Sequence, residues 1–441
     1  MVTPALNPEE GALEPQPATI RKKRSMGALV SHLVGGNLAS MAIRLFAGVL
    51  QGRLVAPATL GLFSSIGLVL RYAPFFQMGI LDGLYRELPY HIGRGAKSRA
   101  EELASAAQAW ALLVGSVCAV ILLGIGGWHL AHARHWIAAG WFTNAVLVLV
   151  FYYKTYYLQV TYRTAHDFSR LALVGVVESI SSLLLLLLVA VFSFYGLCLR
   201  ALLTAAVGLG MLFLWRPIRV APRWNSSHLK HLLRIGLPIF CVGQLYSFWS
   251  VLNSTLVLKY TGVEGMGLYS MVLMAYTSIE FIPVAVRQVV YPRMAERFGK
   301  THSVTDLVQI AWKPILFTAG GLLPIVTIAW LLVDPVVHFL IPSYAAAIPA
   351  MRWVLLLPIV NSFYPVASIF QVARRQDLYG TAVGTGIITY LVAQVWLTRD
   401  EVSLVDFPQA MIIGQVMFSA LCIVLVAHLQ RRERCSTAAK R

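Results

Sequence analysis

Long apolar segments recur along almost the whole chain and leave it few ways to fold. Twelve such runs lie near residues 28–50, 58–81, 103–125, 136–158, 171–192, 195–215, 235–258, 266–291, 308–333, 345–370, 379–397 and 407–429. A helix needs about 20 mostly apolar residues to cross a bilayer, whereas a barrel strand needs only about half that length. We therefore expect an all-α, polytopic membrane protein with about twelve transmembrane helices.

The composition agrees with this fold class and excludes a large soluble domain. Of the 441 residues, 58% are hydrophobic and only 12% are charged, whereas about 25% are charged in ordinary soluble domains. A net charge of +17 would suggest nucleic-acid binding in a soluble protein. Here the basic residues lie mainly in short connectors between apolar runs, so we expect no nucleic-acid partner.

The basic residues favour every second connector, which predicts the orientation of the chain. After the N-terminal cluster Arg21-Lys22-Lys23-Arg24, the alternate connectors hold only Arg53, Arg134, Lys259 and Arg399. Cytoplasmic loops carry the excess of Lys and Arg in membrane proteins. We expect both termini to be cytoplasmic, with a disordered N-terminal arm over residues 1–26 and a basic tail over residues 431–441.

The longest basic connector in the interior, residues 217–233, divides the chain into two similar halves. We predict an N-lobe of helices 1–6 over residues 27–216 and a C-lobe of helices 7–12 over residues 234–430. Gly61-Leu62-Phe63-Ser64 after Arg53 aligns without gaps with Gly267-Leu268-Tyr269-Ser270 after Lys259. Many transporters are built from such repeats. The expected architecture is two pseudo-symmetric six-helix lobes around a central cavity.

Four segments resemble those of a known family. They are Arg53-Leu54-Val55-Ala56-Pro57 with Gly61-Leu62-Phe63; Gly79-Ile80-Leu81-Asp82-Gly83-Leu84; Val263–Ser270 with Ile282-Pro283 and Tyr291-Pro292; and Pro342-Ser343-Tyr344-Ala345-Ala346-Ala347. From Met26 to about Gln430 the chain resembles the polysaccharide-transport family, the O-antigen and oligosaccharidyl-lipid flippases of the multidrug/oligosaccharidyl-lipid/polysaccharide exporter superfamily. It departs at Ala58-Thr59, where family members often carry an acidic residue.

This resemblance implies a function and its partners. A flippase of this family moves polyprenyl-diphosphate-linked oligosaccharides across the bacterial inner membrane by alternating access, for O-antigen, lipopolysaccharide or exopolysaccharide synthesis. The implied partners are the lipid-linked glycan, the bilayer and other polysaccharide-assembly membrane proteins. No cofactor, metal ion or catalytic residue is expected.

Charged residues inside the apolar runs are the candidate site residues. A basic residue near a helix centre costs about 2.5–3.5 kcal/mol on insertion, so Arg44, Arg71 and Arg287 each require a reason. A guanidinium can hold a diphosphate or an acidic sugar through paired hydrogen bonds, and the family uses a cationic central cavity for that purpose. We predict that these three arginines bind the substrate. The alternative is that each snorkels or joins a buried ion pair, as Arg287 and Glu280 could.

Glu178 and Glu280 are the acidic residues within the runs. One interpretation is that they couple transport to a proton or sodium gradient, and the other is that they neutralise the arginines. The sequence leaves both open. Lys154, Lys313 and Arg352 lie nearer the ends of their runs and are attributed to interfaces or ion pairs.

Two other functions fit the sequence less well. A membrane polysaccharide polymerase or glycosyltransferase needs positioned acid and base groups, but the predicted external loops are short and contain no paired carboxylates. His129, His132 and His135 have no acidic neighbours and are interpreted as a solvated loop. A multidrug/cation antiporter of the same superfamily would need an acidic cavity, whereas these spans hold mainly arginines.

Overall fold

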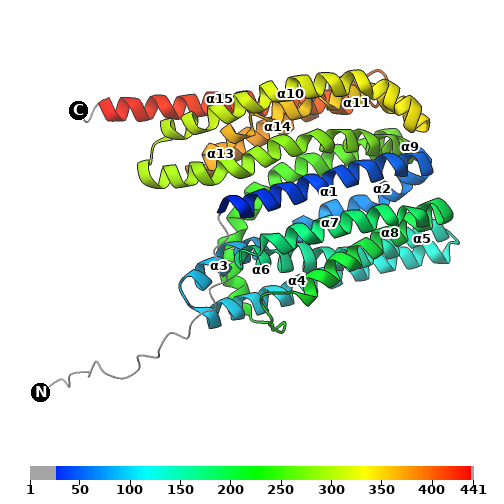
Figure 1. Cartoon of the computed structure of the whole chain (residues 1–441), viewed down its shortest axis with the longest axis horizontal. Coiled ribbons are helices and arrows are strands. Elements are labelled where there is room, and N and C mark those ends of the chain that lie inside the picture. Colours follow the sequence, from blue (N-terminus) through cyan, green and yellow to red (C-terminus); the bar gives the residue numbers. More distant parts are fainter. Residues whose placement is uncertain (1–25, 439–441) are drawn as a thin grey trace, which may run out of the picture.

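The computed structural model describes residues 26–438, and these fold into a bundle of long helices (Figure 1). Nine helices in this part of the chain are long and apolar enough to cross a membrane. The predicted all-α, multi-pass membrane fold is confirmed. The arm predicted over residues 1–26 lies almost wholly outside the described residues, as do the last three residues of the tail.

The first half of the chain forms an N-lobe. Its elements are α1 (Met26–Leu54), α2 (Pro57–Tyr72), the 3₁₀ turn η1 (Ala73–Gln77), α3 (Ile80–Gly93), α4 (Lys97–Ala131), α5 (His135–Phe151), the π-helical η2 (Tyr152–Leu158), α6 (Gln159–Thr164), α7 (Phe168–Leu184) and α8 (Leu186–Leu214). Ser193, with φ 49°, breaks α8. The predicted fifth and sixth runs therefore meet inside one helix.

The second half forms a C-lobe with a more broken path. Its elements are α9 (Ser226–Thr301), α10 (Val304–Leu340), the 3₁₀ turn η3 (Pro342–Ala347), α11 (Ile348–Val354), α12 (Leu357–Asn361), α13 (Tyr364–Val372), α14 (Gln376–Leu397) and α15 (Asp406–Ala438). Gly262 has φ 71° and ψ −166°, a conformation that glycine adopts without steric cost. It divides α9 into two crossings, so each of the twelve predicted runs falls within a helix or an almost unbroken string of helices.

The connector between the lobes is shorter than the predicted linker over residues 217–233. Asn225 begins α9 at Ser226, because its side chain accepts hydrogen bonds from the backbone N–H groups of Ser227 (3.0 Å) and His228 (3.2 Å). The connector also packs on the N-lobe, where the Ser105 hydroxyl donates to the Ala221 carbonyl oxygen at 2.5 Å. It is therefore held against α4.

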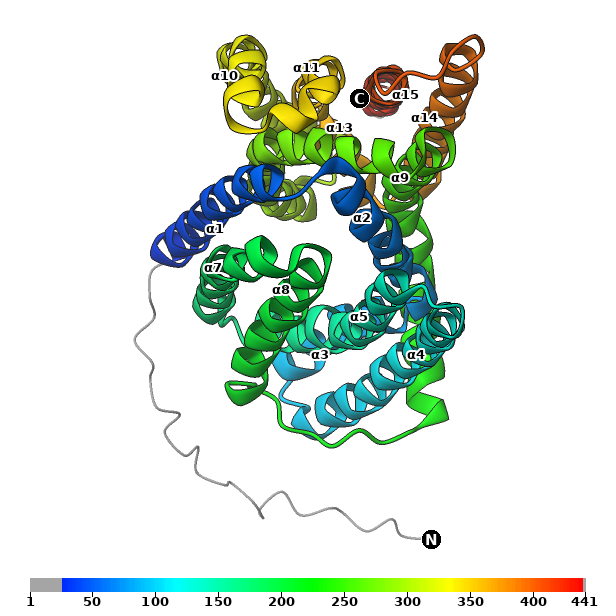
Figure 2. The same ribbon diagram turned by 90° about the vertical axis from the view of Figure 1, so that its right-hand side faces the viewer.

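Figure 2 shows α1 to α8 on one side, α10 to α15 on the other, and α9 passing from the first group to the second. At the end that carries the basic connectors, which we call the basic end, each lobe has its own apolar core. One core contains Leu103 and Tyr162 of the N-lobe, together with Leu232 from the first turns of α9. The other contains Trp249 and Phe418 of the C-lobe.

At the opposite end, which we call the closed end, one apolar cluster joins both lobes. It includes Ala47 and Leu60 of the N-lobe and Met266 and Tyr344 of the C-lobe. The Tyr344 hydroxyl also donates to the Val55 carbonyl oxygen at 2.8 Å, and this bond is buried. The lobes are thus sealed together at this end.

The aligned repeat segments meet each other at the closed end. A Cβ at Gly61 would lie 1.9 Å from the Val263 carbonyl oxygen, and one at Gly267 would lie 1.9 Å from the Pro57 carbonyl oxygen. The Ser270 hydroxyl donates to the Ser64 hydroxyl at 2.8 Å, across 206 residues. Equivalent residues that contact each other reciprocally indicate a local two-fold axis. The two repeat segments of the sequence are thus related by this local axis and pack against each other where the lobes meet.

Candidate functional site

A polar cavity of about 380 Å³ lies inside the N-lobe, between α1, α7, α8 and η2. Its polar lining residues are Arg44, Gln51, Lys154, Glu178, Ser179, Ser182, Arg200 and Thr204. Three of these side chains are cationic and one is anionic. The Thr204 hydroxyl oxygen is buried and has no hydrogen-bond partner among the described residues. The cavity therefore favours a hydrated or polar anionic occupant.

Serines of α7 orient the two arginines of this cavity. The Arg44 Nε donates to the Ser179 hydroxyl at 3.0 Å. The Arg200 Nε donates to the Ser182 carbonyl oxygen at 2.8 Å, and its guanidinium also donates to Gln51. A guanidinium has five N–H donors, so, with respect to the described part of the chain, Arg44 keeps most of its donors free for an anion.

Lys154 and Glu178 form an ion pair in the wall of the cavity, with side chains 14% and 15% exposed. Lys154 lies in the π-helical segment η2, and such segments are frequent at functional sites. The structure thus gives Glu178 a cationic partner, although not one of the predicted arginines. Whether this carboxylate also couples transport to an ion gradient stays a prediction.

The Lys154–Glu178 pair makes a stability prediction. We expect Lys154→Met to destabilise the protein by about 3 kcal/mol, because it leaves Glu178 as an unpaired buried charge. Combining it with Glu178→Gln should recover most of that loss. Thermal unfolding of the purified protein in detergent measures both effects. Lys300→Met is the control, because the Lys300–Glu296 pair is 67% and 69% exposed and should matter little. Additive losses in the double variant would contradict the pairing.

A second cavity of about 400 Å³ lies between the lobes, and Arg71 of α2 lines it. The Arg71 guanidinium donates to the Ser254 hydroxyl of α9 at 2.7 Å, so the arginine reaches across the lobe boundary. Gln51 and Phe63 line this cavity as well as the N-lobe cavity. Arg44 and Arg71 therefore face adjoining spaces.

Arg287 lies apart from the other two arginines, in a C-lobe pocket of about 490 Å³. Tyr246, Tyr291, Tyr364 and Tyr379 also line this pocket. The Arg287 guanidinium stacks over the Tyr364 ring at 4.3 Å. The residues of this pocket lie in or next to the seventh, eighth, tenth and eleventh of the twelve predicted apolar runs. The first, second, fourth and fifth runs, which are their counterparts in the N-lobe, contribute residues to the N-lobe cavity. Each lobe therefore holds an arginine pocket in a corresponding place.

Glu280 accepts a hydrogen bond from the Asn361 side-chain amide at 2.9 Å. Among the described residues, no ion pair within 4.0 Å joins it to Arg287. The structure therefore does not contain the direct ion pair between Arg287 and Glu280 that the sequence allowed.

The comparisons with known proteins place this arrangement in a family. A family model described as polysaccharide biosynthesis protein matches residues 50–347. The chain belongs to this polysaccharide biosynthesis protein family. The resemblance found in the sequence is thereby confirmed. A search of curated proteins finds no match.

Solved structures share the fold of this family member at low sequence identity. An inward-facing multidrug resistance MATE family transporter of the MOP superfamily has a TM-score of 0.69 and 16% identity, covering 93% of this chain and 96% of that one. An outward-facing MATE family structure has a TM-score of 0.65, with the same identity and coverage. A MOP superfamily transporter from Pyrococcus furiosus, in which reverse polarity of the binding pocket suggests a different function, has a TM-score of 0.63 and 16% identity, covering 91% and 95%. This polysaccharide biosynthesis protein therefore has the fold of a membrane transporter.

Proposed function

We propose that the protein flips polyprenyl-diphosphate-linked oligosaccharides across the bacterial inner membrane for cell-surface polysaccharide synthesis. One observation carries the proposal: Arg44 and Arg200 line a cationic N-lobe cavity that adjoins the Arg71 cavity between the lobes. Cations within membrane-spanning helices that have no matching acids are costly unless an anion joins them. The diphosphate of a lipid-linked glycan is such an anion, and the family match supports a role in polysaccharide synthesis.

The mechanism that we propose is alternating access. Paired N–H groups of Arg44 and Arg71 hold the diphosphate oxygens, because a planar guanidinium fits them bidentately. Arg287 and the tyrosines around it offer a cation and ring faces to the glycan. The polyprenyl tail stays in the bilayer, since moving it into protein gains little over lipid.

The arrangement of the lobes supports a direction of loading. One apolar cluster joins the lobes at the closed end, whereas at the basic end their cores are distinct except that the first turns of α9 pack in the N-lobe core. Basic connectors mark the cytoplasmic side of a membrane protein. In this proposal both termini are cytoplasmic, and the structure corresponds to the state that accepts substrate from the cytoplasm.

A multidrug/cation antiporter is the competing function, because MATE family transporters share the fold. An antiporter for organic cations requires an acidic cavity. In the N-lobe cavity three cations face one carboxylate, which Lys154 already pairs. The sign of the cavity thus favours an anionic substrate. An enzyme that builds the glycan would need positioned acid and base groups, whereas the carboxylate that lines the N-lobe cavity, Glu178, is paired with Lys154.

Ligand binding separates the two transporter functions. We expect the purified protein to bind a polyprenyl diphosphate and not an organic cation such as ethidium. Arg44→Gln should weaken diphosphate binding by about 10- to 100-fold, because it removes a charge-assisted hydrogen bond. Arg352→Gln is the matched control, since Arg352 lies over the Trp330 ring at 4.8 Å, outside these cavities. Tight cation binding, or equal diphosphate affinity in Arg44→Gln, would contradict the proposal.

A further inference from the structure

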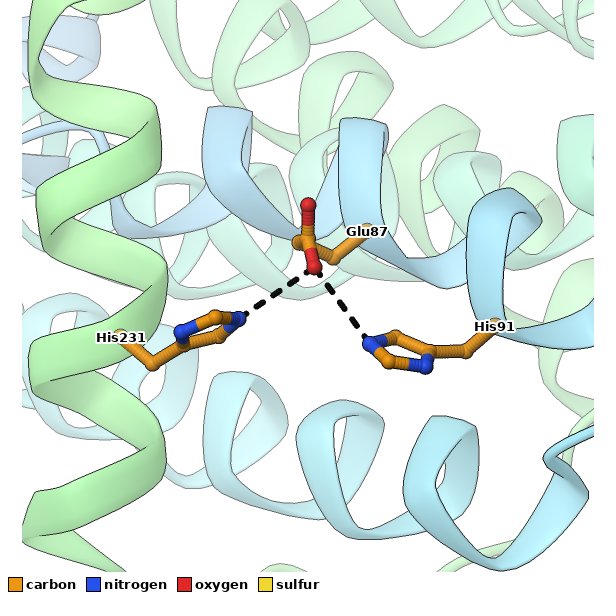
Figure 3. Close-up of side chains that lie close together, drawn as sticks. All are labelled: Glu87, His91 and His231. Carbon is orange, nitrogen blue, oxygen red and sulfur yellow. Dashed lines mark hydrogen bonds and ion pairs between the residues drawn. The ribbon is translucent and has the colours of Figure 1, made fainter.

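Figure 3 shows Glu87, His91 and His231 close together. They belong to the basic end, and none of them lines the arginine cavities. Glu87 and His91 lie on α3, and His231 lies near the start of α9. One Glu87 carboxylate oxygen lies 3.4 Å from the His91 Nε2 and 3.3 Å from the His231 Nε2. All three ligand atoms lie within 4.8 Å of one another.

The backbone holds these three side chains in place. Glu87 and His91 are four residues apart on one helix, so both project from the same face. His231 is presented to them because α9 docks closely on α3 beside it. A Cβ at Gly83 would lie 2.2 Å from the Leu232 carbonyl oxygen, so only glycine permits this approach. The three ligands therefore come from two rigid helices rather than from loops.

The two distances from Glu87 also match the spacing of ligand atoms around a metal ion. The His231 Nε2 makes a long hydrogen bond with the Glu87 carboxylate at 3.3 Å, and the His91 Nε2 lies 3.4 Å from the same oxygen. A tetrahedral zinc ion with bonds of about 2.0–2.1 Å separates its ligand atoms by about 3.3–3.4 Å. The Glu87 oxygen is placed at that separation from both imidazole nitrogens.

The surroundings leave the cluster both sheltered and reachable. The side chains of Glu87 and His91 are 11% and 18% exposed, whereas that of His231 is 41% exposed. Nearby, the Arg99 guanidinium lies 3.2 Å from a Glu102 carboxylate oxygen, and it also contacts the His228 imidazole. Burial and the positive charge of Arg99 lower the pKa of His228. Arg99 and Glu102 thus occupy His228, whereas His231 contacts Glu87.

We propose that Glu87, His91 and His231 form a Zn²⁺ site that clamps the start of α9 to α3. Two imidazoles and one carboxylate provide three protein ligands, and water completes the tetrahedron. Imidazole nitrogen suits zinc and neighbouring transition metals, whereas Mg²⁺ and Ca²⁺ prefer oxygen ligands. This site is independent of the proposed transport function and differs from the sequence-based expectation that no metal is bound.

Metal titration of the full-length, tag-free protein in detergent tests the site. We expect one Zn²⁺ per chain by calorimetry and by elemental analysis, with no comparable binding of Mg²⁺. Glu87→Gln, His91→Ala and His231→Ala should each weaken zinc binding by at least about 100-fold. His228→Ala and His129→Ala, which remove histidines outside the cluster, should keep it. Each variant is first shown by gel filtration and thermal unfolding to be folded.

Two further results decide the proposal. In wild type, Zn²⁺ should slow hydrogen exchange of residues 84–93 and 226–236 together, since the ion joins these two segments. Co²⁺ at the site should give the visible absorption of a tetrahedral complex. Failure of wild type to bind stoichiometric zinc would overturn the proposal. So would zinc binding that is unchanged in the three ligand variants, because it would then come from other surface residues.

Discussion

Joining the side chains of the Ser64→Cys and Ser270→Cys double variant by a disulfide is expected to stop transport. The two serine hydroxyls are 2.8 Å apart, so their side chains already point at each other. A disulfide requires nearby Cβ atoms with facing side chains. The bond would lock the closed end, and alternating access requires this end to open. We expect the initial transport rate to fall at least about 10-fold on oxidation and to return with a reductant.

The cross-linking experiment has a matched control on the same helix. Ser65→Cys with Ser270→Cys places the first thiol one residue further along α2, where it points away from Ser270. The experiment uses a background in which the native cysteines, Cys118, Cys198, Cys241, Cys422 and Cys435, are replaced. Complete cross-linking with unchanged transport would show that the lobes need not separate here. Absence of any cross-link would contradict the contact itself.

Arg71→Gln is expected to lower the initial transport rate by about 10- to 150-fold, with the protein still folded. Loss of a hydrogen bond to a charged group costs about 1.5–3 kcal/mol, which corresponds to that range. Arg71 is accessible in the cavity between the lobes and can contact substrate there. The measurement compares variants at equal incorporation into proteoliposomes.

The control for Arg71→Gln separates charge from the hydrogen bond to α9. Ser254→Ala removes the hydroxyl that accepts from Arg71 at 2.7 Å but keeps the guanidinium. It should retain most of the transport rate, and Arg71→Lys should fall between the two, because lysine keeps the charge without the bidentate geometry. If Ser254→Ala lost as much transport as Arg71→Gln, the role of Arg71 would be to join the lobes.

The fold was largely predictable because its main signal is local. Each apolar run of about 20 residues predicts a transmembrane helix by itself, independently of the segments that pack against it. The repeat was also visible, because Gly61 and Gly267 occupy aligned positions, although their contact required coordinates. The breaks at Ser193 and Gly262 fall in the gaps between predicted runs, although the continuation of helix on both sides of each break required coordinates.

The site was less predictable, because its contacts join distant positions. Arg44 and Arg71 stand out in the sequence as cations within apolar runs, but the sequence could not show that Arg200 shares a cavity with Arg44. Lys154 and Glu178 are 24 residues apart and on different helices. The residues of the proposed zinc site span more still, since His231 lies 144 residues from Glu87. Only the Glu87 and His91 pair, four residues apart, was open to detection as a metal-binding pattern.

The most direct test of the central claim is flipping of a labelled polyprenyl-diphosphate oligosaccharide in proteoliposomes that contain the wild-type protein. Our account predicts that the glycan becomes accessible on the opposite face far faster than in protein-free vesicles, and that organic cations are not exchanged for protons. Glycan movement no faster than in protein-free vesicles, together with proton-coupled exchange of organic cations, would contradict the account and establish the antiporter in its place.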